Sequence, residues 1–387
     1  MRSPSFSVRK MERSGIREVF DLANTMPDAI HLEMGEPDFP TPPHIVEAAH
    51  RAAAEGYTKY TPNAGIPELR EALAHKMTTR NGVAADSERI VVTPGAIAAI
   101  YSSFLALCDP GAEVLIPDPG WPNYRMIATL QSLTAVRYPL RLHAGFKPEV
   151  DVIKPLITPR TKAILLNSPS NPTGAVLERS DLVSILDLAA EHDLWVISDE
   201  VYDEIVYGRS VAPAAAAQGH ADRVVTVCSF SKTYAMTGWR VGYALAPESL
   251  ATLLVKTQEP ITACVNAPAQ MAALEAVTGP QACVSEMVAE YRARRDALVS
   301  ILVGADIPHA APSGAFYLWI DVSATGTGSA DFCRRLLLDT HVAVTPGSAF
   351  GQTCDGFVRI SLATEPASLI EGVRRLAASI QNWSPSV

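Results

Sequence analysis

The sequence predicts an α/β fold with a large domain on a mostly parallel, doubly covered sheet and a small α+β domain. Two observations support this prediction. Through the middle of the chain, short apolar segments alternate with segments of helical periodicity, as in a parallel sheet with helices on both faces. The chain also has 387 residues, of which 48% are hydrophobic, enough for two domains with a substantial core.

The N-terminal part combines two helix patterns with a rigid loop. Residues 13–22 and 44–54 each place apolar side chains on one helical face. Between them, residues 30–34 alternate briefly, as a strand does. Residues 35–43 (GEPDFPTPP) contain several prolines, which lack a backbone N–H and break regular structure. A second turn-rich loop follows at residues 57–65.

The middle and the C-terminal part differ in the order of their elements. In the middle part we expect strands at 89–92, 113–116, 162–166, 194–198 and 224–228, and helices at 66–80, 96–107, 180–192, 268–277 and 284–303. In the C-terminal part we expect strands at 315–320, 342–344 and 357–361, and helices at 330–338 and 369–380. We therefore predict an N-terminal arm with part of the small domain at 1–45, a large domain at 46–280 and a small C-terminal domain at 281–387.

Charge and cysteine content argue against several classes of function. The net charge of −9 and the lack of a basic run argue against a nucleic-acid partner. The six cysteines are scattered without a Cys-x-x-Cys pair, which indicates reduced thiols rather than a disulfide frame or a zinc site. No apolar segment is long enough to span a bilayer or to serve as a signal peptide. We expect a cytoplasmic enzyme without a membrane partner.

Several predicted strands are followed by a glycine or a polar residue, and the residue that follows one of these strands closely is a lysine. Lys232 comes just after the apolar alternating segment 223–230, with Ser229 and Arg240 nearby. In a parallel sheet, ligands bind at the carboxyl ends of strands. A lysine there can form an imine with an aldehyde cofactor, and the hydroxyl and guanidinium groups can bind its phosphate. The other residues at predicted strand ends are Gly95, Trp121, Asn171, Asp199 and Tyr202.

Five of these residues suit the ring of such a cofactor. Trp121 can stack on a planar ring. A carboxylate at Asp199 can keep a pyridine nitrogen protonated, which makes the ring an electron sink. Tyr202 and Asn171 can hydrogen-bond the phenolate oxygen of the ring. Lys232 is the imine-forming group and, once freed, a general base that moves a proton between carbons.

The remaining candidates suit anionic groups. Gly95 and Ala96 begin a predicted helix, whose free amides and dipole favour a phosphate. Arg359, on the predicted strand 357–361, suits the α-carboxylate of a substrate. Each residue alone is more often structural, because Gly95-Ala96-Ile97 is not a P-loop and a strand arginine is usually a surface charge. Their joint position at the strand ends of one sheet favours the functional interpretation.

These residues lie in segments that resemble a known family. The chain is similar to the class I/II aminotransferases, pyridoxal 5'-phosphate (PLP) enzymes of fold type I, in the branch of prokaryotic aspartate and aromatic aminotransferases. The resemblance covers nearly the whole chain. It rests on SGIREVFDLA, GEPDFPTP, YTPNAGIPELREAL, VTPGA, IPDPGWPNY, NSPSNPTGAV, VISDEVYDEIVY, SFSKTYAMTGWRVGY, PSGAFYLWID, VTPGSAFG and FVRISLAT.

The resemblance implies a reaction and a role for each candidate. The reaction transfers an amino group between an L-amino acid and a 2-oxo acid by a ping-pong mechanism. The implied catalytic residues are Lys232, as the Schiff-base lysine, with Asp199 and Tyr202. The implied PLP contacts are Gly95, Ala96, Ile97, Trp121, Asn171, Asp199, Tyr202, Ser229, Lys232 and Arg240. The implied substrate contacts are Gly35, Asn171, Arg359 and Ile16. Tyr60 matches a tyrosine that reaches the phosphate of the neighbouring subunit, which implies a homodimer with shared active sites.

Two positions depart from the members that use aspartate. Those members often have a lysine for the distal carboxylate, and this chain has Ile97 there. They also have a hydroxyl residue near the N-terminal helix, where this chain has Gly15-Ile16. Because an apolar pocket cannot compensate a buried second carboxylate, we predict a preference for neutral donors, aromatic or aliphatic. Arg17 or Arg125 would supply a cation in the alternative, an aspartate aminotransferase.

Two further alternatives stay open at this point. PLP-dependent C–S lyases keep the same lysine, aspartate and arginine on the same scaffold and differ in the fate of the intermediate. A non-catalytic sensor domain of a regulator is the other alternative. Such regulators usually carry an N-terminal DNA-binding region, for which we expect no room before Gly35.

Overall fold

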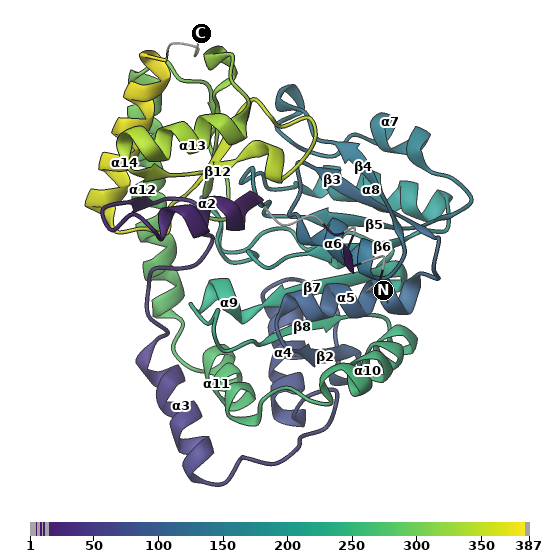
Figure 1. Cartoon of the computed structure of the whole chain (residues 1–387). Coiled ribbons are helices and arrows are strands. Elements are labelled where there is room, and N and C mark those ends of the chain that lie inside the picture. The colour runs from purple at the N-terminus through teal and green to yellow at the C-terminus, as the bar shows by residue number, and fades with distance from the viewer. Residues whose placement is uncertain (1–4, 6–7, 10, 12–14, 384–387) are drawn as a thin grey trace, which may run out of the picture.

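A seven-stranded sheet forms the centre of the molecule (Figure 1). The structure is a computed structural model and describes residues 5, 8–9, 11 and 15–383. The strands follow the order β2-β8-β7-β6-β5-β3-β4. They are β2 Ile90–Thr93, β3 Glu113–Asp118, β4 Thr134–Pro139, β5 Thr161–Asn167, β6 Trp195–Asp199, β7 Val224–Ser229 and β8 Gly242–Leu245. Strand β8 is antiparallel to β2 and β7 and the other pairs are parallel, which confirms the predicted mostly parallel sheet.

Helices cover both faces of this sheet because its strands are apolar on both sides. In β5, Ile164 and Leu166 pack into one core cluster, whereas Ala163 and Leu165 pack into another. Successive side chains of a strand point to opposite faces, so the clusters lie on opposite sides of the sheet. The first cluster includes residues of α3 (Pro43–Ala54), α4 (Pro67–Thr79), α7 (Val150–Ile153), α8 (Arg179–Glu191) and α11 (Ala267–Thr278). The second includes residues of α5 (Ala96–Leu107), α6 (Asn123–Leu130) and α10 (Glu248–Thr262).

The C-terminal part has its own antiparallel sheet and core cluster. The sheet order is β12 (Thr345–Pro346), β13 (Phe357–Ser361), β10 (Tyr317–Asp321) and β9 (His309–Ala310). Helices α12 (Ala282–Gly304), α13 (Ser329–Thr340) and α14 (Pro366–Gln381) pack with it. The N-terminal segment joins this part, because β1 (Ile30–His31) pairs with β11 (Val342–Ala343) and α2 (Gly15–Ala23) packs on α13. Within the described residues, no helix is long and apolar enough to cross a membrane.

The cores of the two parts meet at Trp319. Its ring stacks on Phe357, with 5.4 Å between ring centres, and meets Phe350 edge to face at 5.6 Å. Trp319 and Phe350 belong to the same buried cluster as one face of the central sheet. The segment 281–387 therefore shares packing with the segment 46–280, and the domain limits at residues 45 and 280 stay predictions.

The observed elements differ from the predicted ones in a few places. The sequence pattern does not predict β4, α6, β8 or α10. Strand β8 is only four residues long, and α10 contains Pro260, a residue that usually ends a helix. The predicted strand at 30–34 stops at His31, because the Glu33 carbonyl accepts hydrogen bonds from the Arg359 and Thr345 side chains instead of a strand.

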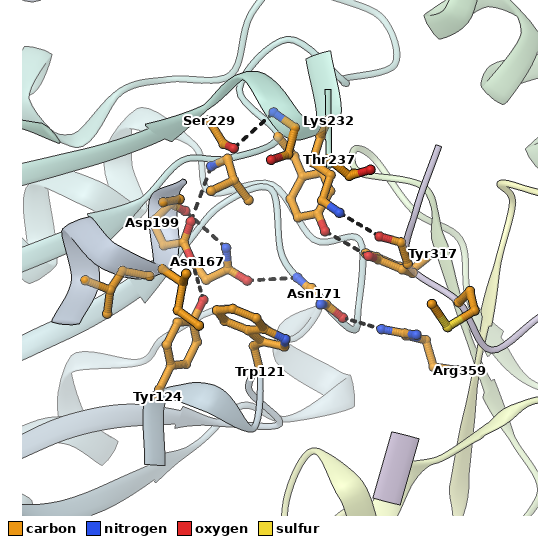
Figure 2. A pocket seen from close by; sticks show the side chains of 18 of the residues that line it. Trp121, Tyr124, Asn167, Asn171, Asp199, Ser229, Lys232, Thr237, Tyr317 and Arg359 are labelled. Carbon is orange, nitrogen blue, oxygen red and sulfur yellow. Dashed lines mark hydrogen bonds between the residues drawn. The ribbon is translucent and has the colours of Figure 1, made fainter. Parts of the chain in front are cut away.

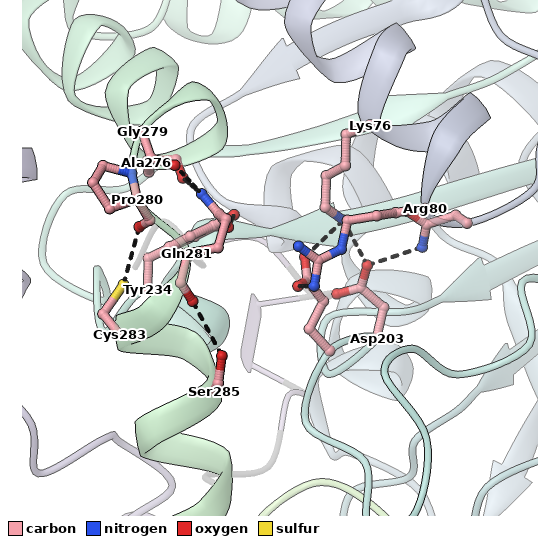
Figure 3. A network of polar contacts seen from close by, with 12 residues as sticks. Lys76, Arg80, Asp203, Tyr234, Ala276, Gly279, Pro280, Gln281, Cys283 and Ser285 are labelled. Atoms are coloured by element: carbon pink, nitrogen blue, oxygen red, sulfur yellow. Dashed lines mark hydrogen bonds and ion pairs between the residues drawn. The ribbon is translucent and has the colours of Figure 1, made fainter.

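A buried group of charges holds the turn that follows β6 (Figure 3). Lys76 Nζ on α4 lies 2.8 Å from Asp203 Oδ2 and 3.2 Å from Glu204 Oε1. Arg80 Nη2 lies 2.5 Å from Glu204 Oε2. The lysine and both carboxylates are buried. These ion pairs therefore fix the turn at residues 199–204 to α4. The turn lies at the carboxyl end of β6, where polar residues collect.

Candidate active site

A cavity of about 320 Å³ lies at the carboxyl ends of three parallel strands (Figure 2). Asn167, Asp199 and Ser229 are the last residues of β5, β6 and β7, and all three line it. Ligands bind at this position in parallel sheets. The sequence-predicted residues that line it are Gly35, Ala96, Ile97, Trp121, Asn171, Asp199, Tyr202, Ser229, Lys232, Arg240 and Arg359.

Two predicted residues are not part of the described cavity wall, and a third has a side chain that the structure does not describe. Gly95 directly precedes Ala96, which lines the cavity. Tyr60 is 91% exposed and lies outside the cavity of its own chain. Ile16 belongs to α2, but its side chain lies outside the described residues.

Lys232 projects from a short helix, α9 (Phe230–Thr233), that begins directly after β7. Its Nζ donates a hydrogen bond of 2.6 Å to the Gly35 carbonyl. Burial lowers the pKa of Lys232 to about 8, the Glu36 carboxylate opposes this shift, and the guanidinium groups of Arg359 and Arg240 add to it. A substantial fraction of the amine is therefore neutral just above neutral pH, as a nucleophile or base requires.

Asp199 ends β6 with its carboxyl group buried against the cavity. Burial raises the pKa of Asp199 to about 6, and hydrogen bonds from Tyr124 and the Val201 amide counteract that rise. Tyr124 Oη donates to Asp199 Oδ2 at 2.6 Å. Among the described residues, no cation pairs with this carboxylate, so a protonated ring nitrogen in the cavity would be its complement.

Two asparagines and two tyrosines connect the centre of the cavity to its far wall. Asn167 Nδ2 donates to the Asp199 carbonyl at 3.0 Å, and Asn167 Oδ1 accepts from the Asn171 amide at 2.8 Å. Tyr202 Oη and Tyr317 Oη are 2.8 Å apart. These contacts fix the Asn171 backbone to Asn167 and the Tyr202 phenol to that of Tyr317.

Arg359 is buried at 2% exposure and faces the cavity from β13. Its Nη1 donates to Asn171 Oδ1 at 3.0 Å, and Nη2 donates to Thr345 Oγ1 and the Glu33 carbonyl. The guanidinium also lies 4.4 Å from the centre of the Tyr317 ring. Within the described part of the chain, no carboxylate forms an ion pair with it, and Nε has no hydrogen-bond partner. A buried guanidinium without a counter-ion is suited to an incoming carboxylate.

The opposite end of the cavity has donors for a second anion. Gly95 has φ +80°, and a Cβ there would overlap the Arg240 guanidinium, so the close approach requires glycine. The Gly95 amide already donates to the Thr93 carbonyl at 2.7 Å, which leaves the next amides of α5 to bind an anion. Ser229 Oγ accepts from the Ser231 amide, so its hydroxyl hydrogen stays available. Together these groups are suited to a phosphate.

The cavity thus fits the PLP that the sequence implies. An amine of lowered pKa lies between an unpaired buried carboxylate and a glycine cradle under a guanidinium. Trp121 lines the cavity and packs edge to face against Tyr124, with 5.6 Å between ring centres. The donor set therefore matches an aldehyde, a pyridine nitrogen and a phosphate in one molecule.

Sequence reasoning missed Tyr124, Asn167 and Tyr317 as members of the site. Tyr124 follows a Pro-Gly turn, and Tyr317 lies in an apolar strand, where an aromatic residue usually serves packing. Both stand in segments that carry the family resemblance, IPDPGWPNY and PSGAFYLWID. Their place in these two segments was the only feature of the sequence that could have indicated their role.

Comparison with known proteins gives consistent matches over nearly the whole chain. The family model "Aminotransferase class I and II" matches residues 27–376. An aspartate aminotransferase of Pyrococcus abyssi is 42% identical, with 94% of each chain covered. Aromatic-amino-acid aminotransferase 2 of Thermococcus litoralis is 40% identical, again with 94% of each chain covered. The structure of a Thermus thermophilus aspartate aminotransferase with maleate has a TM-score of 0.92 at 38% identity, covering 98% of this chain and 100% of that one.

Proposed function

This chain belongs to the class I and II aminotransferases, and we propose that it prefers neutral amino acids, aromatic or aliphatic, as amino donors. As a member of the family it is a PLP-dependent transaminase that exchanges an amino group between an amino acid and a 2-oxo acid. The observation that carries the preference is the wall formed by Ile97 and Ile100. A second carboxylate buried against this apolar wall would lack a counter-charge.

The geometry supports a division of roles among the residues. Bound PLP supplies an electron sink for negative charge that develops on the substrate Cα. Arg359 holds the α-carboxylate, since its guanidinium is buried without a counter-ion. Lys232 Nζ removes the proton from Cα and later returns it, and its lowered pKa suits this work near neutral pH. Asp199 stabilises a proton on the ring nitrogen, and Tyr124 holds the carboxylate in position.

The remaining candidates bind rather than react. Asn171 contacts Arg359 and lines the same cavity as Tyr202, so both are suited to the ring's phenolate oxygen. Ser229, Arg240 and the first amides of α5 are suited to the phosphate. Trp121 is placed to cover the ring. The Gly35 backbone borders both Lys232 and the cavity, which suits a substrate contact.

The exposed aromatic at Tyr60 supports a homodimer with shared active sites. Tyr60 is fully outside its own cavity, and Tyr57 and Ile261 are large exposed apolar residues as well. We infer that Tyr60 reaches the phosphate of the partner's cofactor. The test mixes two variants, K232A and Y60A, under conditions of subunit exchange. Restored turnover in the mixture is expected, because one hybrid site contains both native residues; a mixture as inactive as its components would contradict shared sites.

The proposed location is the cytoplasm. All six cysteines are free in the structure, and Cys108, Cys228, Cys333 and Cys354 are buried. Burial raises the pKa of Cys108 to about 11, so this thiol is unreactive near neutral pH. Six unpaired thiols suit a reducing compartment.

A donor screen tests the proposed preference. Purified holoenzyme is mixed with single amino acids without an oxo acid, and the loss of the PLP absorbance is followed in a stopped-flow instrument. Phenylalanine, tyrosine and leucine are expected to react faster than aspartate. Fast conversion by aspartate with none by phenylalanine would overturn the preference, and release of pyruvate and ammonia would indicate elimination instead of transamination.

A further inference from the structure

Two loops meet above Lys232, and one of them has a strained backbone. The loop at residues 234–241 leads from α9 to β8 and contains two non-glycine residues in the left-handed region, Ala235 at φ 50° and Arg240 at φ 56°. Such conformations are strained in non-glycine residues and persist where the surroundings fix them. The surroundings here are the loop at residues 35–42, which belongs to the N-terminal segment.

Three side-chain contacts join these loops. Thr41 Oγ1 donates to the Ala235 carbonyl at 2.6 Å, and Trp239 Nε1 donates to Thr41 Oγ1 at 3.0 Å. Thr237 Oγ1 donates to the carboxylate of Glu36. Thr237 also lines the cavity. The contact through Glu36 is therefore the one of the three that reaches the active site.

Glu36 directly follows the residue that binds the lysine. The Gly35 carbonyl accepts from Lys232 Nζ at 2.6 Å, so the Glu36–Thr237 contact fixes the backbone that receives this hydrogen bond. Among the described residues, Glu36 is also the carboxylate whose charge raises the pKa of Lys232 against the effect of burial. The two guanidinium groups that act on the same amine are those of Arg240 and Arg359.

Four other titratable groups line the same cavity, Tyr124, Asp199, Tyr202 and Tyr317. Asp199 is fully buried and hydrogen-bonded to Tyr124, and burial raises its pKa to about 6. Tyr202 and Tyr317 hydrogen-bond one another, and burial raises the pKa of both phenols. The two phenols therefore stay neutral near neutral pH, and Tyr124 holds the Asp199 carboxylate. At the Lys232 amine, the charge of Glu36 opposes those of Arg240 and Arg359.

We propose that Glu36 is a positioning residue for the lysine of the reaction: through Thr237 it holds the Gly35 carbonyl against Lys232 Nζ and provides the counter-charge when the amine carries the proton taken from Cα. This inference rests on the role of Lys232 proposed above. The proton moves from Cα to Nζ, the ammonium donates to the Gly35 carbonyl while the charge of the adjacent Glu36 favours its protonated form, and the same proton is later returned from Nζ to carbon. No other reactant is required.

The charge is tested with E36Q, which removes the carboxylate but keeps an oxygen that accepts from Thr237. The matched control is D38N, because Asp38 lies in the same loop and pairs with Arg294 at 2.8 Å instead. The full-length chain is prepared without cofactor and labelled with an acylating reagent across a pH series, and the Lys232 peptide is quantified by mass spectrometry. We expect the labelling midpoint of E36Q to fall by about half a pH unit, because an exposed carboxylate is partly screened by solvent.

The holoenzyme provides the second readout. The acid limb of kcat against pH is expected to move in the same direction for E36Q and to stay in place for D38N. Equal labelling midpoints and equal pH profiles for E36Q, D38N and the wild type would overturn the charge role.

The contact between Thr237 and Glu36 is tested with T237V, which keeps the charges of Glu36 and Lys232 and removes the hydroxyl of residue 237. We expect kcat to fall about 10-fold, because the Gly35 carbonyl loses its support, and T237S to restore it. Equal activity of T237V and the wild type would overturn the positioning role. K232A separates the proposed function from the role of Glu36. If K232A keeps its turnover, the proposed function fails. If K232A loses its turnover while E36Q and T237V behave like the wild type, only the role of Glu36 is removed.

Discussion

Lys76 is buried and Lys232 is partly buried, both near the carboxyl edge of the central sheet, and their environments shift their pKa values in opposite directions. Lys76 contacts the carboxylates of Asp203 and Glu204, and although burial acts against it, the pKa of Lys76 is raised well above its ordinary value. Lys232 contacts only a backbone carbonyl, and burial lowers its pKa to about 8. Carboxylate contact, rather than burial, thus separates a structural ammonium from an amine that can react.

Replacement of the reactive lysine has the largest expected effect. K232A should reduce kcat by at least about 10⁴-fold, because both the covalent partner of PLP and the base for the Cα proton are lost. The measurement is steady-state turnover together with the absorbance spectrum of bound PLP. The fold should persist, since a buried, unpaired amine is removed. Retained turnover would contradict the role assigned to Lys232.

Replacement of the structural lysine should affect stability instead of chemistry. K76M leaves the buried carboxylates of Asp203 and Glu204 without Lys76, and we expect a loss of about 3–5 kcal/mol in the free energy of unfolding. Urea titration followed by circular dichroism measures it. K154M is the control, because Lys154 pairs with Glu191 on the surface and should unfold like the wild type. Equal midpoints for K76M and K154M would contradict a structural role.

The pH dependence of stability should separate the two lysines further. The folded-state pKa of Lys232 is about 8 against an ordinary value of 10.5, so the unfolded chain binds one more proton between these values. Stability of the cofactor-free protein relative to K232M should therefore rise with pH through this window, by up to about 3 kcal/mol.

The contribution of Lys76 to the pH dependence of stability has the opposite sign. Its pKa is raised, so its contribution is complete below 10.5 and is lost only as pH rises through the raised value. Urea titrations of the wild type, K232M and K76M at pH 7, 9 and 10 measure both dependences. A K232M difference that stays constant from pH 7 to pH 10 would contradict the lowered pKa of Lys232.

A third lysine can be introduced to sharpen the comparison. I97K places an ammonium in the cavity wall, where a dicarboxylic substrate can supply its carboxylate partner. We expect the ratio of kcat/KM for aspartate to that for phenylalanine to rise about 10- to 30-fold. I97M controls for a change of shape without charge. An unchanged ratio in I97K would place the side-chain pocket elsewhere.

The sequence predicted the reactive lysine and did not predict the structural one. Lys232 follows an apolar strand, and strands of a parallel sheet end at a common edge, so its surroundings follow from local patterns. Lys76 lies on a helix, where a lysine usually faces water, and its burial arises from packing against a turn more than a hundred residues away.

The same limit applies elsewhere in the molecule. Strand β13 occupies the predicted residues Phe357–Ser361, because apolar alternation is a local signal. The hydrogen bond from Tyr124 to Asp199 joins residues 75 positions apart, and no local pattern indicates it. The Glu36–Thr237 contact joins residues 201 positions apart. Partners of this kind follow from the fold as a whole.

The join at Trp319 has a consequence for how this protein can diversify. Trp319 packs on Phe350 and Phe357, and Phe350 lies 5.0 Å from the Arg359 guanidinium, so the arginine is fixed to the core that carries Lys232. Ile97, by contrast, lies in the first turn of α5 and is only half-buried. During evolution, a substitution at Ile97 can therefore change which substrate the enzyme accepts while Lys232 and Arg359 keep their positions.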